Sequence, residues 1–268
     1  MSPELEYILA RRVLLDALSA LGPQREAVVL VGAQAIYLQV GEADLAVPAM
    51  TTDGDLTLDP RRLGDVPLVS AAMLEGGVQP LKQPGAWQGR NGVQIDLMVP
   101  EALSGRPGHR GADLGVHGHS AARQTKGLEA TVVDNDIRAV ASFEADDMRV
   151  FEIAVAGPAA LLVAKLVKIS ERVGTPRLED KDGLDVLRLL RGTDTIALAR
   201  RLAELRTDPI AGDVTKEALS QFPLLFGKPR SIGCEMAARA AWPVVSGEVI
   251  MASCVTLTAD LIAALDVA

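Results

Sequence analysis

The hydrophobic pattern of the first 156 residues predicts a mixture of helices and strands. Residues 3–21 place apolar side chains at helical spacing, whereas residues 27–31 are a short, wholly apolar run of strand type. Residues 92–99 alternate between polar and apolar side chains, as a half-buried strand does. We predict further helices at 33–40 and 67–75, and further strands at 55–58, 78–81, 129–133, 137–142 and 149–155.

The pattern changes after Gly157. Pro158 suits the first turn of a helix, and the segments that follow are rich in Ala and Leu at helical spacing. We predict helices at 158–173, 179–192, 194–206, 213–222, 231–241 and 246–266. The chain is therefore expected to have an α+β fold with two domains, in which a mixed sheet with flanking helices (1–156) precedes a helical domain (157–268).

Composition narrows the class of protein. Apolar residues make up 49% of the 268 residues, which is enough to bury a core and excludes a disordered chain. A net charge of −8 argues against general DNA binding, because phosphate neutralisation needs a basic surface. The acidic N-terminus lacks the features of a signal peptide, and we see no apolar stretch of membrane-spanning length. We expect a soluble, cytoplasmic protein without a membrane partner.

Cysteine usage agrees with that expectation. Cys234 and Cys254 lie in apolar helical segments. A disulfide between them is possible, but this setting favours two buried free thiols.

Carboxylates provide the first candidate chemistry. Asp53 and Asp55 flank Gly54, and residues i and i+2 of a strand point to the same face. Two negative charges so close together are costly unless a cation lies between them, and Mg²⁺ prefers such oxygen ligands. Asp96 interrupts an otherwise apolar strand and completes a three-carboxylate cluster if the two strands are neighbours, which suits two-metal phosphoryl transfer. The alternatives are a solvated turn for the pair and a surface position for Asp96.

The order of these features resembles the signature of the DNA-polymerase-β-like nucleotidyltransferase superfamily. A strand leads to Gly32-Ala33, a helix follows, the next strand bears Thr52-Asp53-Gly54-Asp55, and Asp96 lies on a later strand. The resemblance implies a nucleoside triphosphate substrate and a Mg²⁺ or Mn²⁺ cofactor. It also implies that Asp53, Asp55 and Asp96 bind the metal and act in catalysis, and that Gly32, Ala33 and Thr52 contact the nucleotide.

The second half of the chain extends the resemblance. Lys165, Lys168 and Arg172 are spaced to share one face of a helix, and Lys181, Asp182 and Asp185 open the next one. This arrangement is similar to the AbiEii branch, which includes toxins of type IV toxin–antitoxin systems and the mycobacterial MenT toxins. It implies that Lys165 contacts the triphosphate with Asp182 or Asp185 as its partner, and that the other basic residues face the carboxylate cluster. The alternative is a solvated helix face.

The function expected from this resemblance is Mg²⁺-dependent transfer of a nucleotide from a nucleoside triphosphate to an acceptor. The acceptor could be tRNA, a protein side chain or a small molecule, and an antitoxin is a possible partner. Ala33 and Gly54 differ from the residues usual at their positions. The alternative is therefore a non-catalytic nucleotide-binding or protein-binding module that keeps the fold.

Residues 101–126 are rich in Gly, His and Arg, and we predict a long surface loop there. His109, His117 and His119 have a spacing that can bind Zn²⁺. The second interpretation is a mobile flap over the acceptor that carries Arg106, Arg110, Arg123 and Lys126. The third, which we favour, is a plain solvated insertion.

Overall fold

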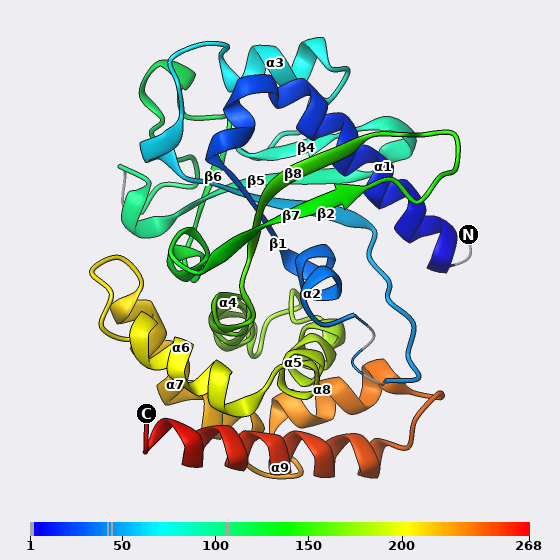
Figure 1. Ribbon diagram of the computed structural model, residues 1–268, viewed down its shortest axis with the longest axis vertical. Helices are drawn as coiled ribbons and strands as arrows, with labels where there is room; N and C mark the ends of the chain where they lie inside the picture. Colours follow the sequence, from blue (N-terminus) through cyan, green and yellow to red (C-terminus); the bar gives the residue numbers. More distant parts are fainter. Residues whose placement is uncertain (1–2, 42, 44, 106–107) are drawn as a thin grey trace. The chain divides into compact units, whose positions relative to one another are not determined.

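The structure is a computed structural model that describes residues 3–41, 43, 45–105 and 108–268. Contacts divide the chain into two compact units. The first consists of residues 1–35 and 49–156, and the second of residues 36–48 and 157–268. The first contains a mixed sheet with flanking helices and the second is helical, so the predicted α+β fold class is confirmed (Figure 1).

The longer helices and strands of the first unit lie where the sequence predicts them. Its α-helices are α1 (Pro3–Leu21), α3 (Val69–Glu75) and the start of α2 (Gly32–Val40), which continues into the second unit. Its strands are β1 (Val28–Val31), β2 (Asp53–Leu58), β3 (Gln79–Pro80), β4 (Ala86–Gln88), β5 (Gln94–Pro100), β6 (Arg123–Thr125), β7 (Asn135–Ala141) and β8 (Val150–Ala156). Short 3-10 turns connect them at Gly22–Ala27, Pro60–Arg62, Arg90–Gly92, Glu101–Leu103, Gly115–His117 and Glu129–Val132.

The described strands form one mixed sheet in the order β3-β4-β5-β2-β1-β8-β7, and β6 also pairs with β5. β1 lies between β2 and β8, and all four of its residues are buried, which explains its unbroken run of apolar side chains. β2 runs antiparallel to β1 and parallel to β5. This order makes the strand that bears Asp53 and Asp55 the direct neighbour of the strand that bears Asp96.

One face of the sheet is closed by α1. The helix packs against α3, β2 and β5, and the apolar side chains of its second half, including Leu14 and Leu18, are buried (Figure 1). Ile95 and Leu97 of β5 are also fully buried, and they alternate with Asp96 along the strand. The acids of β2 and β5 therefore belong to the face opposite the one that α1 covers.

The second unit is built from α4 (Pro158–Arg172), α5 (Asp180–Gly192), α6 (Thr195–Leu205), α7 (Gly212–Phe226), α8 (Ile232–Ala241) and α9 (Gly247–Leu265). α5 packs against α4 and α8, and α9 packs against α6 and α8. Leu, Val, Ala and Phe side chains fill the space between these helices.

Residues 36–48 pack with this second unit, whereas the prediction places them in the first domain. Arg188 of α5 is buried and donates hydrogen bonds to the carbonyl oxygens of Val47 (2.8 Å) and Pro48 (3.2 Å). Its guanidinium also lies 5.3 Å from the ring centroid of Tyr37. A single buried cation thus ties this segment to α5, a contact that sequence spacing does not reveal.

Two local predictions are wrong. Residues 129–132 form a 3-10 turn instead of a strand, because the Glu129 carboxylate accepts hydrogen bonds from the backbone N–H groups of Ala102 and Gly127. Burial raises the pKa of Glu129, and these hydrogen bonds oppose that change. Residues 101–126 are also more than a surface loop, since β6 joins the sheet there and Ala112 and Ala121 are fully buried.

The cysteines and α9 complete the second unit. Cys234 and Cys254 are buried free thiols, in agreement with the favoured prediction. α9 is long and apolar enough to cross a membrane by length and composition, so the statement that no such stretch exists was wrong. A core helix of a soluble protein passes the same test, which makes this weak support for a membrane span.

Candidate functional site

The three predicted acids lie on one face of two neighbouring strands. Asp55 pairs in register with Asp96 across the parallel β2–β5 ladder, and Asp53 lies two residues before Asp55. Side chains at i and i+2, and those paired in register, point to the same face. Asp53 and Asp55 are half-buried, and Asp96 is only 7% exposed. The sequence prediction that Asp96 lies beside the Asp53/Asp55 pair is therefore met by the strand order.

Asp55 lies against the first residue of α2. Gly32 has a φ of +70°, and a Cβ placed on it would lie 2.2 Å from Oδ2 of Asp55. Any side chain at position 32 would have to displace this carboxylate. The first residue of α2 and the acid of β2 therefore share a space that only glycine leaves open.

Asp53 is held by two neighbours that the sequence analysis did not identify. The Thr51 hydroxyl donates a 2.7 Å hydrogen bond to Oδ1 of Asp53. The Gln34 side-chain amide donates to the Asp53 carbonyl oxygen at 3.0 Å, and the buried Arg11 donates to the Gln34 side-chain oxygen at 2.8 Å. These contacts connect α1, α2 and β2, and they fix the backbone at the start of β2. Thr52, predicted to contact the nucleotide, is exposed at this position.

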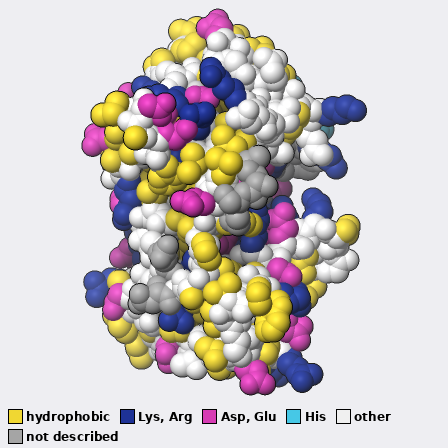
Figure 2. All heavy atoms as spheres, turned by 90° about the vertical axis from the view of Figure 1, so that its right-hand side faces the viewer, with side chains coloured by type: hydrophobic (Ala, Val, Ile, Leu, Met, Phe, Trp, Pro, Cys, Tyr) yellow, Lys and Arg dark blue, Asp and Glu magenta, His cyan; other side chains and the backbone are white. Residues whose placement is uncertain are grey.

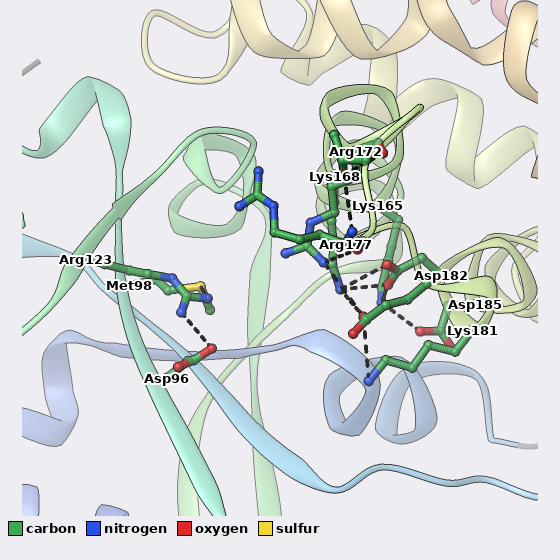
Figure 3. Close-up of polar contacts among 12 residues, drawn as sticks. Asp96, Met98, Arg123, Lys165, Lys168, Arg172, Arg177, Lys181, Asp182 and Asp185 are labelled. Atoms are coloured by element: carbon green, nitrogen blue, oxygen red, sulfur yellow. Dashed lines mark hydrogen bonds and ion pairs between the residues drawn. The ribbon is translucent and has the colours of Figure 1, made fainter. Parts of the chain in front are cut away.

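Asp96 is engaged on both of its oxygens. Gln94 donates a 2.8 Å hydrogen bond to Oδ1, and the Arg123 guanidinium lies 2.8 Å from Oδ2 (Figure 3). Arg123 also donates to the sulfur of Met98 at 3.2 Å. Arg123 belongs to the segment that was predicted to be a basic loop, but β6 brings it to the face of β5 that bears Asp96.

A divalent cation suits part of this arrangement. Asp53 and Asp55 are half-buried carboxylates on one strand face, and Mg²⁺ binds through one or two carboxylates plus substrate phosphates. In the described part of the chain, no three His, Cys, Asp or Glu side chains are grouped as metal ligands. The lack of a three-ligand group is explained by Asp96, the third acid, whose carboxylate is paired with Arg123. The residues present thus fit a cation held by Asp53 and Asp55.

Gly54, which departs from the residue usual in the superfamily pattern, is explained by packing. A Cβ on Gly54 would lie 2.6 Å from Cδ1 of Ile95 and 3.6 Å from the Leu14 side chain. Ile95 already occupies the space beside Gly54 on the face that α1 covers. The glycine lies on the opposite face from the two acids and leaves their positions unchanged.

A second group of charged residues lies within the helical unit. Nζ of Lys165 lies 2.6 Å from Asp182 and 2.7 Å from Asp185, and all three side chains are at most 8% exposed (Figure 3). Burial alone would lower the pKa of Lys165, but Asp185 and Asp182 outweigh it, so its pKa is raised. Burial likewise opposes ionisation of Asp182, yet Lys165 and Lys168 lower its pKa to about 2. Lys165 and Asp182 are therefore both charged at neutral pH.

The remaining basic residues of this group lie nearer to solvent. Lys168 lies 3.0 Å from Asp182, and Lys168, Arg172 and Lys181 all lie within 4 Å of the Glu179 carboxylate. Their side chains are between 27% and 39% exposed. Acids of α5 and Glu179, the residue before it, thus balance the charges of the basic residues predicted to share one helix face. Of these residues, Lys168 and Arg172 reach solvent and Lys165 does not. Their role in binding nucleotide stays a prediction.

The histidines are not assembled into a metal site in the described residues. His117 is buried, and its Nδ1 accepts a hydrogen bond from the Val69 N–H while Nε2 lies 2.9 Å from the Gly64 carbonyl oxygen. This histidine ties the segment to the start of α3. His109 and His119 are exposed, and Arg106 lies outside the described residues.

Comparison with known proteins decides the family. A family model described as nucleotidyltransferase matches residues 11–184, which span the acids of β2 and β5, the start of α2 and the Lys165–Asp182 pair. The chain belongs to the nucleotidyltransferase family. Searches of curated proteins and of solved structures gave no match.

Membership of this family makes the protein a transferase whose substrate is a nucleoside triphosphate. Nucleotidyltransferases commonly use Mg²⁺ or Mn²⁺, in keeping with the Asp53/Asp55 pair. The alternative of a non-catalytic module rested on Ala33 and Gly54. The packing of Gly54 against Ile95 removes one of those two reasons.

Proposed function

We propose that this nucleotidyltransferase transfers a nucleoside monophosphate from a nucleoside triphosphate to an acceptor hydroxyl, with Mg²⁺ or Mn²⁺ bound by Asp53 and Asp55. The acceptor oxygen attacks the α-phosphorus, the bond from that phosphorus to the bridging oxygen breaks, and pyrophosphate leaves. The acceptor proton passes to one of the carboxylates of β2.

The observation that carries this proposal is the contact between Gly32 and Asp55. The start of a helix offers backbone N–H groups and a favourable dipole to phosphate. In this chain that helix start touches a metal-type carboxylate so closely that a Cβ would lie 2.2 Å from it. A phosphate-binding element and a cation-binding element are thus adjacent, which is the requirement for handling a metal-bound triphosphate.

The residues around the start of β2 and the start of α2 then have separate roles. Asp53 and Asp55 hold the cation, which neutralises phosphate charge when it is bound. Thr51 orients the Asp53 carboxylate, and Gln34, held by Arg11, fixes the Asp53 carbonyl. Ala33 is buried behind the helix start and contributes backbone rather than a side-chain donor.

In the second unit we propose that Lys165, Lys168, Arg172 and Lys181 contact phosphate oxygens. Asp182 and Asp185 hold the Lys165 amine from two sides at 2.6 and 2.7 Å, which supports a fixed position for that charge. The partly exposed side chains of Lys168 and Arg172 leave donors available to a polyphosphate. This assignment rests on the resemblance to the AbiEii branch.

That resemblance also supports a role as the toxin of a type IV toxin–antitoxin system in the cytoplasm, with tRNA or a protein as acceptor. Figure 2 shows acidic side chains interspersed with basic ones on the face it displays. With a net charge of −8, binding of tRNA would depend on local groups of Lys and Arg rather than on the total charge.

Transfer of label provides the test. The protein is incubated with each of the four α-labelled nucleoside triphosphates, Mg²⁺ and total tRNA, and labelled RNA and protein are separated. We expect label on one of them with the wild type, and at least a hundredfold less with Asp53→Asn, because loss of the cation site removes transition-state stabilisation.

Asp136→Asn is the matched control, since Asp136 is a half-exposed acid on another strand of the same sheet. It is expected to transfer as the wild type does. The proposal fails if no nucleotide is transferred, or if Asp53→Asn transfers as well as Asp136→Asn.

A further inference from the structure

We propose that Arg123 is a phosphate-binding residue of the nucleotide site, and that Asp96 binds its guanidinium while the site contains no nucleotide. In the protein without nucleotide, the Arg123 guanidinium neutralises Asp96. When a metal-bound triphosphate is present, the guanidinium contacts a phosphate oxygen and Asp96 is released to the cation. This inference rests on the proposed function and adds a residue to the same site.

The position of Arg123 is set by the sheet. β6 pairs in parallel with β5, with Arg123 opposite Met98, and Met98 lies two residues after Asp96 on the same face. The Arg123 side chain therefore starts on the acid face and runs back along β5 to Asp96, as Figure 3 shows. Asp55 is the register partner of Asp96 on the other edge of β5. The guanidinium thus lies one strand away from the proposed cation ligands.

Close backbone contacts on both sides of Arg123 fix the position of β6. A Cβ on Gly85 would lie 2.4 Å from the Arg123 backbone nitrogen and 2.2 Å from the Leu97 carbonyl oxygen. Gly111 forms an isolated bridge with Arg123 on its other side. Close backbone contacts on both edges keep β6 fixed, so a change in partner for Arg123 requires movement of its side chain alone.

The Arg123 side chain is more exposed than that of Asp96, as it must be if Arg123 is to leave Asp96 for a phosphate. The Asp96 side chain is 11% exposed and is also held by Gln94, whereas the Arg123 side chain is 29% exposed. Asp53, Asp55 and Asp96 place three negative charges on one face, and Arg123 offsets one of them. An arginine suits the second role because its planar donors match two phosphate oxygens.

The exchange predicts opposite effects on two affinities. Without nucleotide, Arg123 competes with a divalent cation for Asp96, so Arg123→Met should bind Mn²⁺ more tightly, by at least threefold. With Mn²⁺ at saturation, loss of a charged donor should weaken binding of inorganic triphosphate by about tenfold or more. Asp96→Asn should bind triphosphate more tightly than the wild type in the absence of metal, because Arg123 is then free of its carboxylate.

Isothermal titration calorimetry on the full chain measures all three affinities, and thermal melting checks that each variant folds. Arg138→Met is the matched control: Arg138 also pairs with an aspartate at 2.8 Å on a strand of the sheet, on β7. It should leave all three affinities unchanged. If Arg123→Met does not fold, the inference is tested with Asp96→Asn and Arg123→Lys instead. Arg123→Lys should keep the Mn²⁺ affinity of the wild type but bind triphosphate less tightly.

The outcomes separate this inference from the proposed function. If the wild type binds Mn²⁺ and triphosphate but the Arg123 variants match Arg138→Met, the Asp96 pair is structural and the inference is wrong. The same conclusion follows if Asp96→Asn gains no affinity for triphosphate. If the wild type binds neither ligand, the proposed function fails and the inference fails with it.

Discussion

Replacing Lys165 with methionine should destabilise the helical unit strongly. Lys165 lies 2.6 Å from Asp182 and 2.7 Å from Asp185, and the side chains are only 8%, 1% and 4% exposed. Methionine would fill most of the volume but leave two buried carboxylates, of which Asp182 keeps Lys168 at 3.0 Å. Removing one partner of a buried ion pair costs about 3–5 kcal/mol, because the charge left behind is uncompensated. In a domain of this size that corresponds to a fall in Tm of roughly 6–20 °C.

Urea unfolding should be followed by two signals. Far-UV circular dichroism is dominated by the helices, most of which lie in the second unit. Fluorescence of Trp87, which is buried in the first unit, reports on the sheet once the exposed Trp242 of the second unit is replaced by phenylalanine. Lys216→Met is the control, because Lys216 pairs with a fully exposed aspartate on α7 and should leave the midpoint unchanged. Adding Asp185→Leu to the Lys165 variant should recover part of the loss. A loss below about 1 kcal/mol for Lys165→Met would refute the reasoning, since such a value is typical of a solvated pair.

Three further predictions concern single positions. Gly32→Ala should fold but lose about 1–2 kcal/mol of stability from its φ of +70°, and at least tenfold in nucleotide transfer, because its Cβ displaces Asp55; unchanged transfer rates would contradict the proposed contact. Gly54→Ala should cost about 1–3 kcal/mol by overpacking against Ile95, and melting that matches the wild type would show that the space is open. The pKa of Asp182 is lowered from 3.8 to about 2, so its ionisation stabilises the protein above pH 4, and this contribution is lost as the pH falls towards 2. Between pH 5 and 2 the wild type should therefore lose about 2 kcal/mol more than Asp182→Asn, measured by urea unfolding, and equal losses would contradict the lowered pKa.

Much of the fold could be predicted because long elements bury one continuous face. The apolar spacing of α1, α4 and α9 marks helices whose bounds agree with the structure to within two residues. β1 and β5 were also identified, since one is wholly buried and the other alternates. Asp96 was recognisable as the polar exception in β5.

Two short strands and one turn could not be predicted from periodicity. β4 and β6 are three residues long, too short to show alternation, and they exist because β5 offers each of them half of one edge. Residues 129–132 are apolar enough for a strand, but the buried Glu129 carboxylate binds backbone N–H groups and closes a turn instead. In both cases contacts with distant residues decide the structure.

The candidate site shows the same division. The acids and Gly32 could be recognised because their order along the chain resembles the nucleotidyltransferase signature. Thr51, Gln34 and Arg123 were missed as partners, since their roles depend on strand register and on which helix lies beside β2. Gly54 was interpreted as a departure from the expected pattern, and only the position of Ile95 explains it.

The position of the transferred label tests the central claim most directly. The acceptor reaction is run in parallel with triphosphates labelled at the α-phosphate and at the γ-phosphate, using the wild type, Asp53→Asn and Asp55→Asn. The account predicts that α-label is retained on the acceptor, that γ-label leaves as pyrophosphate, and that both aspartate variants abolish transfer. Retention of γ-label on the acceptor, or α-label transfer that survives in both variants, would contradict it.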